Sequence, residues 1–353
     1  MEKTLGDTLR GLNGPVLITG HSGFKGTWLT LMLERLGIQV IGVSLEAEKN
    51  SLYSRCNRKD RIPELITDLA NYNLVNEFFN KYKPSAVFHM AAQPLVLESY
   101  KTPRKTFETN VMGTVNILDI CLQFESVKSV AVITTDKVYK NNNSNNNFVE
   151  TDPLEGKDPY SSSKVAAEAS AIAWQQLSNL NSGPEIFTLR AGNVIGGGDW
   201  SENRLIPDLI RALIENENLN VRNPNSTRPW QHVLDPLYGY ILACESSLQG
   251  AKIKSINFGP LGSSLSVTKV LNIAMNSWDK QSETKIQIVD NDEALEAKTL
   301  SLDSNLASKI LNWSPNWSQE SAVVDTMKWW DKVINKSVSP FQACMYDIEK
   351  IIE

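Results

Sequence analysis

The segment TGHSGFKG, residues 19–26, limits the possible folds more than any other part of the sequence. It follows the apolar run Val16–Thr19, which predicts a buried strand, and it opens a predicted helix over Gly26–Leu36. Glycines in this context allow a sharp turn, close approach of the backbone to a pyrophosphate, and close packing of the helix on the sheet. The helix N-terminus then offers unpaired N–H groups to the anion. The motif therefore favours dinucleotide binding through Gly20, Gly23 and Gly26 over a purely structural turn.

Strand-like and helix-like stretches alternate along the first half of the chain. The predicted strands are Val16–Thr19, Gln39–Ser44, Ala86–Met90, Ser129–Thr134 and Glu185–Arg190, and the predicted helices are Gly26–Leu36, Thr106–Gln123 and Ser161–Leu177. Such alternation implies right-handed crossovers and a parallel sheet that is covered on both faces. We therefore predict an α/β fold with a doubly wound, Rossmann-type parallel sheet.

The pattern changes beyond Gly192, where three consecutive glycines, several prolines and scattered tryptophans follow. One later run, Lys254–Phe258, still predicts a sheet strand. We therefore expect a dinucleotide-binding domain over residues 1–192, to which the chain returns around 233–262, and a smaller α+β substrate-binding domain built mainly from residues 193–353. The polar tract at 141–147, NNNSNNN, is expected to be a solvated loop.

Composition excludes several classes of function. A net charge of −5 gives no electrostatic reason to expect a nucleic-acid partner. Four widely separated cysteines and only three histidines indicate neither a disulfide framework nor a metal site. The sequence contains no apolar run long enough for a membrane span and no apolar leader near residue 1. A cytoplasmic location is therefore the expectation.

The residues near the predicted second and third strands bear on which dinucleotide binds. Glu46, just beyond the second strand, could accept hydrogen bonds from a ribose diol, and no arginine stands there to bind a 2′-phosphate. These features favour NAD. Asp68 follows the apolar stretch Ile62–Ile66 and could either lie at the adenine or cap a helix, and both roles can hold together.

Tyr160 and Lys164, in the segment DPYSSSK, lie one helical turn apart and would project from the same face of a helix. Free tyrosine has a pKa of about 10, and a neighbouring ammonium group would lower the pKa of Tyr160 by favouring the phenolate. Such a phenolate could remove a proton from a sugar hydroxyl while a hydride leaves for NAD. A YxxxK pair alone is common in helices, but its combination with an upstream glycine turn in an α/β chain is specific.

Together these motifs resemble the extended short-chain dehydrogenase/reductase family, whose members act on nucleotide sugars. The resemblance implies that Thr135, in the segment TTDKVYK, hydrogen-bonds the substrate hydroxyl. Epimerases of the family need no further groups. The 4,6-dehydratases must also eliminate water across C5 and C6, and this step needs an adjacent acid and base.

Asp136 and Lys137 provide that pair. In the expected reaction Tyr160 takes the C4 hydroxyl proton, Lys137 removes the C5 hydrogen that the new ketone acidifies, and Asp136 protonates the departing C6 oxygen. Lys137 must be neutral and Asp136 protonated for these roles, so the two groups are expected to titrate together, and their assignment as base and acid is open.

Further motifs resemble the dehydratases of this family that act on CDP-glucose, in which Lys replaces the Glu of other dehydratases at position 137. The motifs are GHSGFKGTWL, HMAAQPLVLESY, TTDKVY, DPYSSSK, RAGNVIGGGDW, RLIPDLIRA and VRNPNSTRPWQHVLDPLYGY. The resemblance assigns the cofactor to Gly20, Gly23, Phe24, Gly26, Asp68, Leu69, Ala91, Ala92, Asn110, Tyr160 and Lys164. It assigns the nucleotide sugar to Gln93, Thr135, Asn193, Arg204, Leu205 and Arg228, with Arg228 on the diphosphate.

Read without the resemblance, Arg228 is an exposed loop cation and Asn193 a turn residue. Leu97 stands where relatives usually carry an arginine, which leaves the nucleotide and sugar open to other choices. The resemblance also implies a homodimer through the two helices at 106–123 and 161–177. The alternatives are an epimerase or a dehydratase for another nucleotide sugar, and a catalytically silent NAD-binding regulator, which would usually lack Tyr160 or Lys164.

Overall fold

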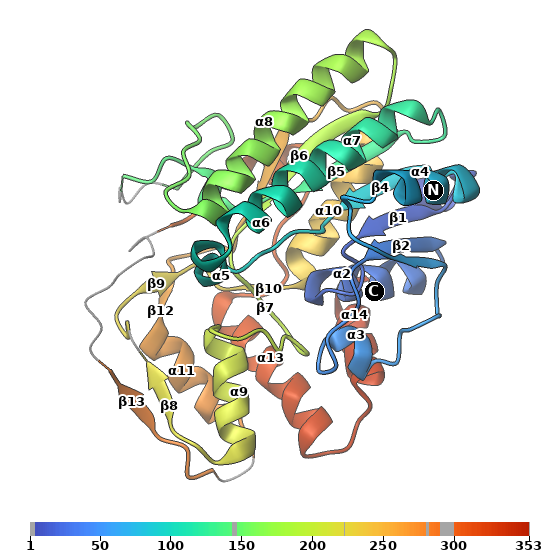
Figure 1. Cartoon of the computed structure of the whole chain (residues 1–353). Helices are drawn as coiled ribbons and strands as arrows, with labels where there is room; N and C mark the ends of the chain where they lie inside the picture. The colour runs from blue at the N-terminus through green and yellow to red at the C-terminus, as the bar shows by residue number, and fades with distance from the viewer. Residues whose placement is uncertain (1–3, 143–146, 222, 280–281, 290–299, 353) are drawn as a thin grey trace.

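A parallel sheet forms the centre of the computed structural model, which describes residues 4–142, 147–221, 223–279, 282–289 and 300–352. Within these residues the sheet has seven strands in the order β11–β6–β5–β4–β1–β2–β3 (Figure 1). Their bounds are β1 Val16–Thr19, β2 Val40–Ser44, β3 Glu64–Ile66, β4 Ala86–His89, β5 Ser129–Ile133, β6 Glu185–Ala191 and β11 Ser255–Phe258. Every neighbouring pair is parallel. The doubly wound α/β fold is confirmed.

Helices cover both faces of the sheet (Figure 1). One face carries α4 (Tyr72–Tyr82), α7 (Gly113–Gln123) and α8 (Pro159–Leu180), and the other carries α2 (Phe24–Arg35) and α10 (Leu234–Leu248). Alternate strand residues enter two separate apolar cores, with Leu17 on the α7 side and Ile18 on the α10 side. Burial on both faces explains why these strands are continuous apolar runs.

The second half of the chain adds helices and short ladders at the carboxyl ends of the strands. Three two-stranded pairs occur in the described residues: β7 (Val194–Ile195) with β10 (Gln231–His232), β9 (Thr227–Arg228) with β12 (Leu265–Ser266), and β8 (Leu219–Val221) with β13 (Ile286–Ile288). The helices here are α9 (Leu205–Glu215), α11 (Val267–Asn276), α12 (Asn305–Leu311), α13 (Gln319–Ile334) and α14 (Pro340–Ile352).

The chain comes back to the central sheet more than once. Strand β11 extends the sheet beside β6, and α10 packs on β5 and β6. The C-terminal helix α14 also packs against α2 and α3 (Leu52–Arg55), which the sequence pattern did not indicate. The two-domain division, with its boundary near residue 192, stays a prediction.

Several predicted boundaries shift by a few residues for local reasons. Helix α8 begins at Pro159, because Asp158 and Ser161 form a reciprocal capping box there. The predicted helix Thr106–Gln123 is one helical course made of α6 (Pro103–Phe107), a π-helical turn η1 (Glu108–Met112) and α7. The remaining short helices are α1 (Asp7–Arg10) and α5 (Val96–Lys101).

Three predictions made from the sequence concern features other than the predicted site residues. Residues 143–146 of the Asn-rich tract lie outside the described residues; of the others, Asn142 and Asn147 are exposed as expected, whereas Asn141 is buried. Among the described residues, no helix has the length and apolar character needed to cross a lipid bilayer. Over the same residues, no group of three or more His, Cys, Asp or Glu side chains is arranged to hold a metal ion.

Candidate active site

The glycine turn packs so tightly that side chains are excluded at two of its three glycines. Gly20 has a φ of 74°, in the left-handed region, and a Cβ there would lie 2.9 Å from the backbone of Ala91. A Cβ on Gly26 would lie 2.1 Å from the carbonyl oxygen of Gly20. Gly23 is the N-cap of α2, and no side chain caps that helix end. The N-terminus of α2 has no side-chain cap and lies beside a turn with no room for a Cβ at Gly20 or Gly26, which fits a pyrophosphate.

The other residues assigned to the cofactor surround this turn. Phe24 is the first residue of α2, and Ala91 and Ala92 follow β4, all three half-buried. Leu69 is buried in the core beneath α7. Glu46 is exposed two residues beyond β2, and its contact with a ribose stays a prediction.

Asp68 lies two residues beyond β3, and its contact with the adenine stays a prediction. Its carboxylate accepts hydrogen bonds from the Ala70 amide at 2.9 Å and from Lys105 at 2.8 Å, and the bond from Lys105 lowers its pKa. The alternative role as a helix N-cap is wrong, since the N-cap of α4 is Asn71.

Asn110 is buried in the π-helical turn η1, and its contact with the cofactor stays a prediction. Its side-chain oxygen accepts the Gln93 amide at 2.7 Å, and its amide group donates to the Gln93 carbonyl and to Ser163. A π-turn places an extra residue on one face of a helix, and such turns are frequent at functional sites. Asn110 therefore ties the segment after β4 to α8.

Tyr160 and Lys164 share one face of α8 and point toward the carboxyl end of β5. Burial raises the pKa of the Tyr160 phenol, and the Lys137 charge opposes that rise more strongly than the nearby Thr135 hydroxyl does. Lys164 donates from Nζ to the Ile133 carbonyl at 3.1 Å, and burial lowers its pKa to about 8. The charges of Lys137 and, more weakly, Arg204 thus oppose the rise in the pKa of Tyr160, and the expected effect of Lys164 on that pKa stays a prediction.

The Thr-Asp-Lys segment forms a short 3₁₀ turn, η2 (Asp136–Val138), directly after β5. The Thr135 hydroxyl accepts the Lys137 amide at 3.3 Å and donates to Asp136 Oδ1 at 2.9 Å. Lys137 Nζ lies 3.6 Å from Asp136 Oδ1, with the Lys137 side chain 23% exposed and that of Asp136 only 2%. The acid and base candidates are therefore adjacent, and both are largely withdrawn from solvent.

Residues from distant segments complete this cluster. Asn193 Oδ1 accepts a hydrogen bond from Lys137 Nζ at 3.2 Å, and a Cβ on Gly192 would lie 3.0 Å from Asp136 Oδ2. Arg204, held by Asp199 at 3.1 Å, is close enough to lower the pKa of Tyr160. Asn193 and Arg204, two residues assigned to the nucleotide sugar, thus lie at the catalytic turn.

The other residues assigned to the nucleotide sugar lie around the cluster. Leu205 is the half-buried first residue of α9. Gln93 is half-buried, and its side-chain amide bonds Thr106 and the Leu95 amide. Arg228 lies half-buried on β9, next to Pro229, whose ring would be 3.4 Å from a Cβ on Gly192.

Lys25, which sequence reasoning missed, belongs to the same cluster. It lies inside the glycine turn, and its Nζ donates to the Tyr240 hydroxyl at 2.8 Å. Burial and then the charges of Lys164 and Arg204 lower the pKa of Lys25 to about 7, while Asp136 opposes this. The available signal was a lysine placed between two glycines of the turn, Gly23 and Gly26.

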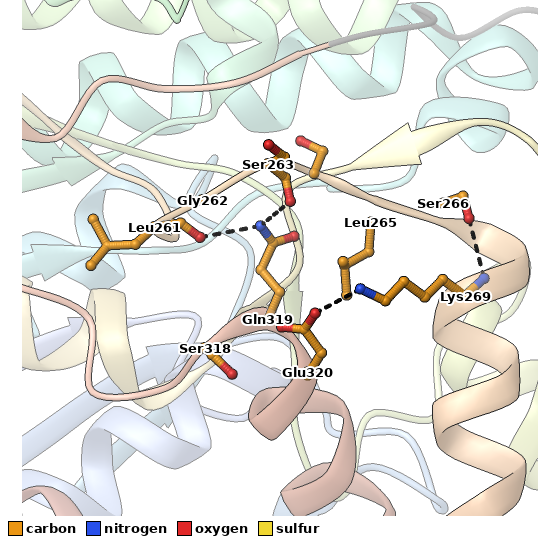
Figure 2. A pocket seen from close by; sticks show the side chains of 10 residues that line it. Leu261, Gly262, Ser263, Leu265, Ser266, Lys269, Ser318, Gln319 and Glu320 are labelled. Carbon is orange, nitrogen blue, oxygen red and sulfur yellow. Dashed lines mark hydrogen bonds and ion pairs between the residues drawn. The ribbon is translucent and has the colours of Figure 1, made fainter.

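A hollow of about 390 Å³ lies away from these side chains, between the N-termini of α11 and α13. Figure 2 shows the Gln319 amide pointing to the carbonyls of Leu261 and Ser263, while Lys269 pairs with Glu320. Gln319 also accepts the amide of Trp230, two residues after Arg228. The polar groups of this hollow thus support the strand that carries Arg228.

Comparison with known proteins agrees with this geometry. The family model described as GDP-mannose 4,6 dehydratase matches residues 17–326. The CDP-glucose 4,6-dehydratase of Salmonella typhimurium is 38% identical over 323 residues, which cover 89% of each chain.

Solved structures with the same fold include both epimerases and dehydratases. A UDP-glucose 4-epimerase from Brucella ovis, in complex with NAD, has a TM-score of 0.78 at 21% identity over 89% of this chain and 97% of its own. The dTDP-glucose 4,6-dehydratase DesIV from Streptomyces venezuelae, solved with NAD, has a TM-score of 0.77 at 22% identity over 93% and 99%. The match of the family model and the identity to the Salmonella enzyme show that this chain belongs to the GDP-mannose 4,6-dehydratase family, within the extended short-chain dehydrogenases/reductases.

Proposed function

We propose that this chain is an NAD-dependent CDP-glucose 4,6-dehydratase, which converts CDP-D-glucose to CDP-4-dehydro-6-deoxy-D-glucose and water. The observation that carries the proposal is the Asp136–Lys137 pair, whose charged atoms are 3.6 Å apart on a turn beside Tyr160. The 38% identity to a CDP-glucose 4,6-dehydratase over 89% of the chain supports the choice of substrate. The packed glycine turn and the uncapped N-terminus of α2 support the choice of a dinucleotide.

The chain's own residues move the protons of this reaction. NAD, when bound, supplies the hydride acceptor at C4 and the hydride donor at C6. Tyr160 takes the proton of the C4 hydroxyl, which Thr135 orients by a hydrogen bond. Lys137 then removes the C5 proton, and Asp136 gives its proton to the C6 oxygen, which leaves as water. Lys137 finally returns its proton to C5.

The number of protons held by the Asp136–Lys137 pair suits this order of proton transfers. A neutral lysine beside a protonated aspartic acid holds the same single proton as an ammonium beside a carboxylate. The reactive form is therefore one proton transfer away from the ion pair, across the 3.6 Å between Lys137 Nζ and Asp136 Oδ1.

The catalytic cycle leaves one proton on Tyr160 and one missing from Asp136. The Thr135 hydroxyl lies within hydrogen-bonding reach of the Tyr160 phenol and donates to Asp136 Oδ1 at 2.9 Å. It provides a direct path for that proton to restore Asp136, and each turnover then leaves the enzyme as it began.

Turnover of CDP-glucose tests the proposal directly. Purified protein with NAD and CDP-glucose should give a product with the alkali-induced absorbance of a 4-keto-6-deoxy sugar. Turnover of dTDP-glucose or GDP-mannose, but not CDP-glucose, would show that the substrate is wrong. Lys137→Ala should abolish this product, whereas an epimerase would keep nearly full turnover.

The proposal also covers the oligomeric state of the enzyme and its location in the cell. Exposed apolar side chains on α8 and on the helical course that leads into α7 fit a homodimer formed through these helices; they are Phe107 on α6, Met112 on η1, and Ile172, Leu177 and Leu180 on α8. NAD and nucleotide sugars are metabolites of the cytoplasm, so we place the enzyme there. The product class fits deoxysugar biosynthesis, including that of lipopolysaccharide O-antigens.

A further inference from the structure

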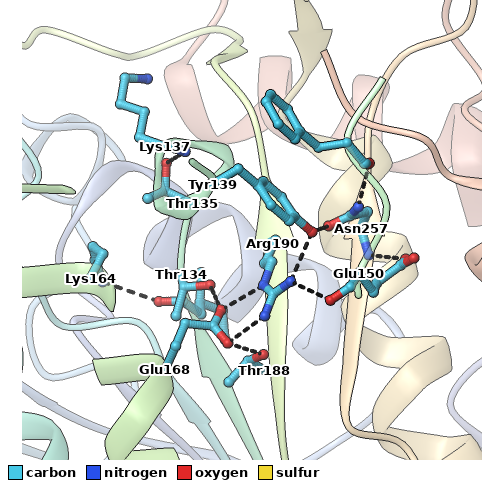
Figure 3. Close-up of polar contacts among 12 residues, drawn as sticks. Thr134, Thr135, Lys137, Tyr139, Glu150, Lys164, Glu168, Thr188, Arg190 and Asn257 are labelled. Carbon is cyan, nitrogen blue, oxygen red and sulfur yellow. Dashed lines mark hydrogen bonds and ion pairs between the residues drawn. The ribbon is translucent and has the colours of Figure 1, made fainter. Parts of the chain in front are cut away.

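A buried ion pair lies directly behind the catalytic turn (Figure 3). Glu168 on α8 and Arg190 on β6 form two parallel hydrogen bonds of 2.8 Å, from Nε to Oε1 and from Nη2 to Oε2. Their side chains are 1% and 4% exposed. A buried pair of this kind costs desolvation energy, and it adds little to stability over apolar residues of the same volume. Its arrangement therefore calls for a role other than simple stabilisation.

The remaining hydrogen bonds of the pair hold both ends of the catalytic turn. Thr134, the residue before Thr135, donates from its hydroxyl to Glu168 Oε1 at 2.5 Å. At the other end of the turn, Arg190 Nη1 donates at 2.8 Å to the hydroxyl of Tyr139, two residues after Lys137. A single ion pair thus hydrogen-bonds to the chain on either side of the Thr135–Asp136–Lys137 segment.

Tyr139 is also held by contacts with residues outside the ion pair. The Tyr139 hydroxyl donates to Asn257 Oδ1 on β11 at 2.7 Å, and its ring stacks on Phe148 with centroids 4.9 Å apart. Arg190 also donates to the carbonyl of Glu150. The far end of the turn is therefore fixed to both β6 and β11.

The hydrogen bond at Thr134 is made from the same face of α8 that carries Tyr160. Lys164 binds the carbonyl of Ile133, and Glu168, one helical turn later, binds the hydroxyl of the next residue, Thr134. Tyr160, Lys164 and Glu168 are spaced four residues apart and meet consecutive residues of one strand end. The distance between Tyr160 and the Asp136–Lys137 pair thus depends on these contacts.

We propose that Glu168 and Arg190 are positioning residues for the elimination step, which set Asp136 and Lys137 at the correct distance from the sugar held by Tyr160. The inference rests on the proposed dehydratase function. Oxidation at C4 depends on the cofactor and on Tyr160, which removes the proton, while Thr135 of the turn contributes only by orienting the C4 hydroxyl. Elimination depends on Asp136 and Lys137, whose turn is held at both ends by the strand end and this pair.

Two matched substitutions separate positioning from stability. Thr134→Val and Thr188→Val each remove one buried hydroxyl that donates to Glu168, from neighbouring strands of the same sheet. Of the two threonines, only Thr134 leads directly into the catalytic turn. Thr134→Ser keeps the hydroxyl and serves as the rescue variant.

The expected results differ between turnover and stability. Thr134→Val should lower kcat by about 10- to 100-fold with KM within about threefold, because sub-ångström misplacement of reacting groups is costly. Reduced cofactor should build up in a single turnover, since C4 oxidation continues while elimination slows. Thr188→Val and Thr134→Ser should keep kcat within about threefold, and the two valine variants should lower the urea midpoint of unfolding by similar amounts.

Equal loss of turnover in the two valine variants, or slow turnover without accumulated reduced cofactor, would overturn the positioning role while leaving the dehydratase function intact. If Thr134→Val does not fold, Tyr139→Phe can be used instead. It removes the hydroxyl that Arg190 binds at the other end of the turn and keeps the ring stacked on Phe148. Accumulation of reduced cofactor in that variant supports the proposal, and its absence refutes it. An inactive wild type toward every nucleotide sugar would instead refute the proposed function and this inference with it.

Discussion

Substitution of single glycines in the first turn should separate the stability of the fold from its affinity for NAD. Gly26→Ala places a methyl group 2.1 Å from the carbonyl oxygen of Gly20, and 2.8 Å from both the Gly20 carbonyl carbon and the Cα of His21. Gly23→Ala places its methyl 3.2 Å from the same oxygen. The first substitution cannot be accommodated by rotating a side chain, because all three neighbours are backbone atoms.

The magnitudes follow from these distances. Real Cβ atoms essentially never approach closer than 3.0 Å, so α2 must move by about 0.9 Å to accept Gly26→Ala. Overpacking of this kind costs about 3 kcal/mol, and the better helix propensity of alanine returns about 1 kcal/mol. We expect Gly26→Ala to lower the free energy of unfolding by about 2 kcal/mol. Gly23→Ala, at an N-cap, should cost less than about 1 kcal/mol.

Urea unfolding and NAD titration by calorimetry measure the two effects. Gly23→Ala should fold with nearly wild-type stability and bind NAD at least about 10-fold more weakly, because its methyl occupies the approach to the pyrophosphate. Gly26→Ala should lose both stability and affinity, since the helix N-terminus itself is displaced. Wild-type stability in Gly26→Ala, or a larger loss of stability in Gly23→Ala, would refute the packing of the turn described here.

Three further predictions follow from the structure. Asn193→Ala removes the acceptor that holds Lys137 Nζ and should slow formation of the 4-keto product about 10-fold while leaving C4 oxidation unchanged in stopped-flow absorbance. Burial raises the pKa of Asp235 to about 7, so the stability from its protonated form is full below about pH 4 and is lost as pH rises through 7. The free energy of unfolding of Asp235→Asn minus that of the wild type should therefore rise by about 3 kcal/mol between about pH 5 and pH 8. The same difference at both pH values would contradict the raised pKa of Asp235. Ile172→Asp, at a site 53% exposed on α8, should dissociate the proposed dimer in analytical ultracentrifugation, whereas Leu261→Asp, 66% exposed elsewhere, should not.

The parts of the site that sequence predicted are those whose partners are close along the chain. Thr135, Asp136 and Lys137 are consecutive, and a strand followed by a 3₁₀ turn brings their polar groups together. Tyr160 and Lys164 share a helix face because of the helical repeat. The glycine turn was recognisable because its strand and helix flank it directly.

The features that sequence missed depend on contacts between distant segments. The contact of Lys137 with Asn193 and the pair Glu168–Arg190 join residues 56 and 22 positions apart. Lys164 lies on the same helix face as Tyr160, as expected, but its hydrogen bond to the Ile133 carbonyl was not predicted. No local pattern states which of several acceptors a buried lysine will reach.

The order of residues along the chain determined the α/β architecture, the dinucleotide turn and the identity of the reacting groups, because hydrophobic period, glycine placement and adjacent side chains act over short distances. The tertiary structure decided which of those groups are buried, which cations act on Tyr160, and how the catalytic turn is held from behind. Burial and the distance to neighbouring charges change the free energy of protonating a side chain by several kcal/mol. Both depend on segments that meet only after the sheet has formed.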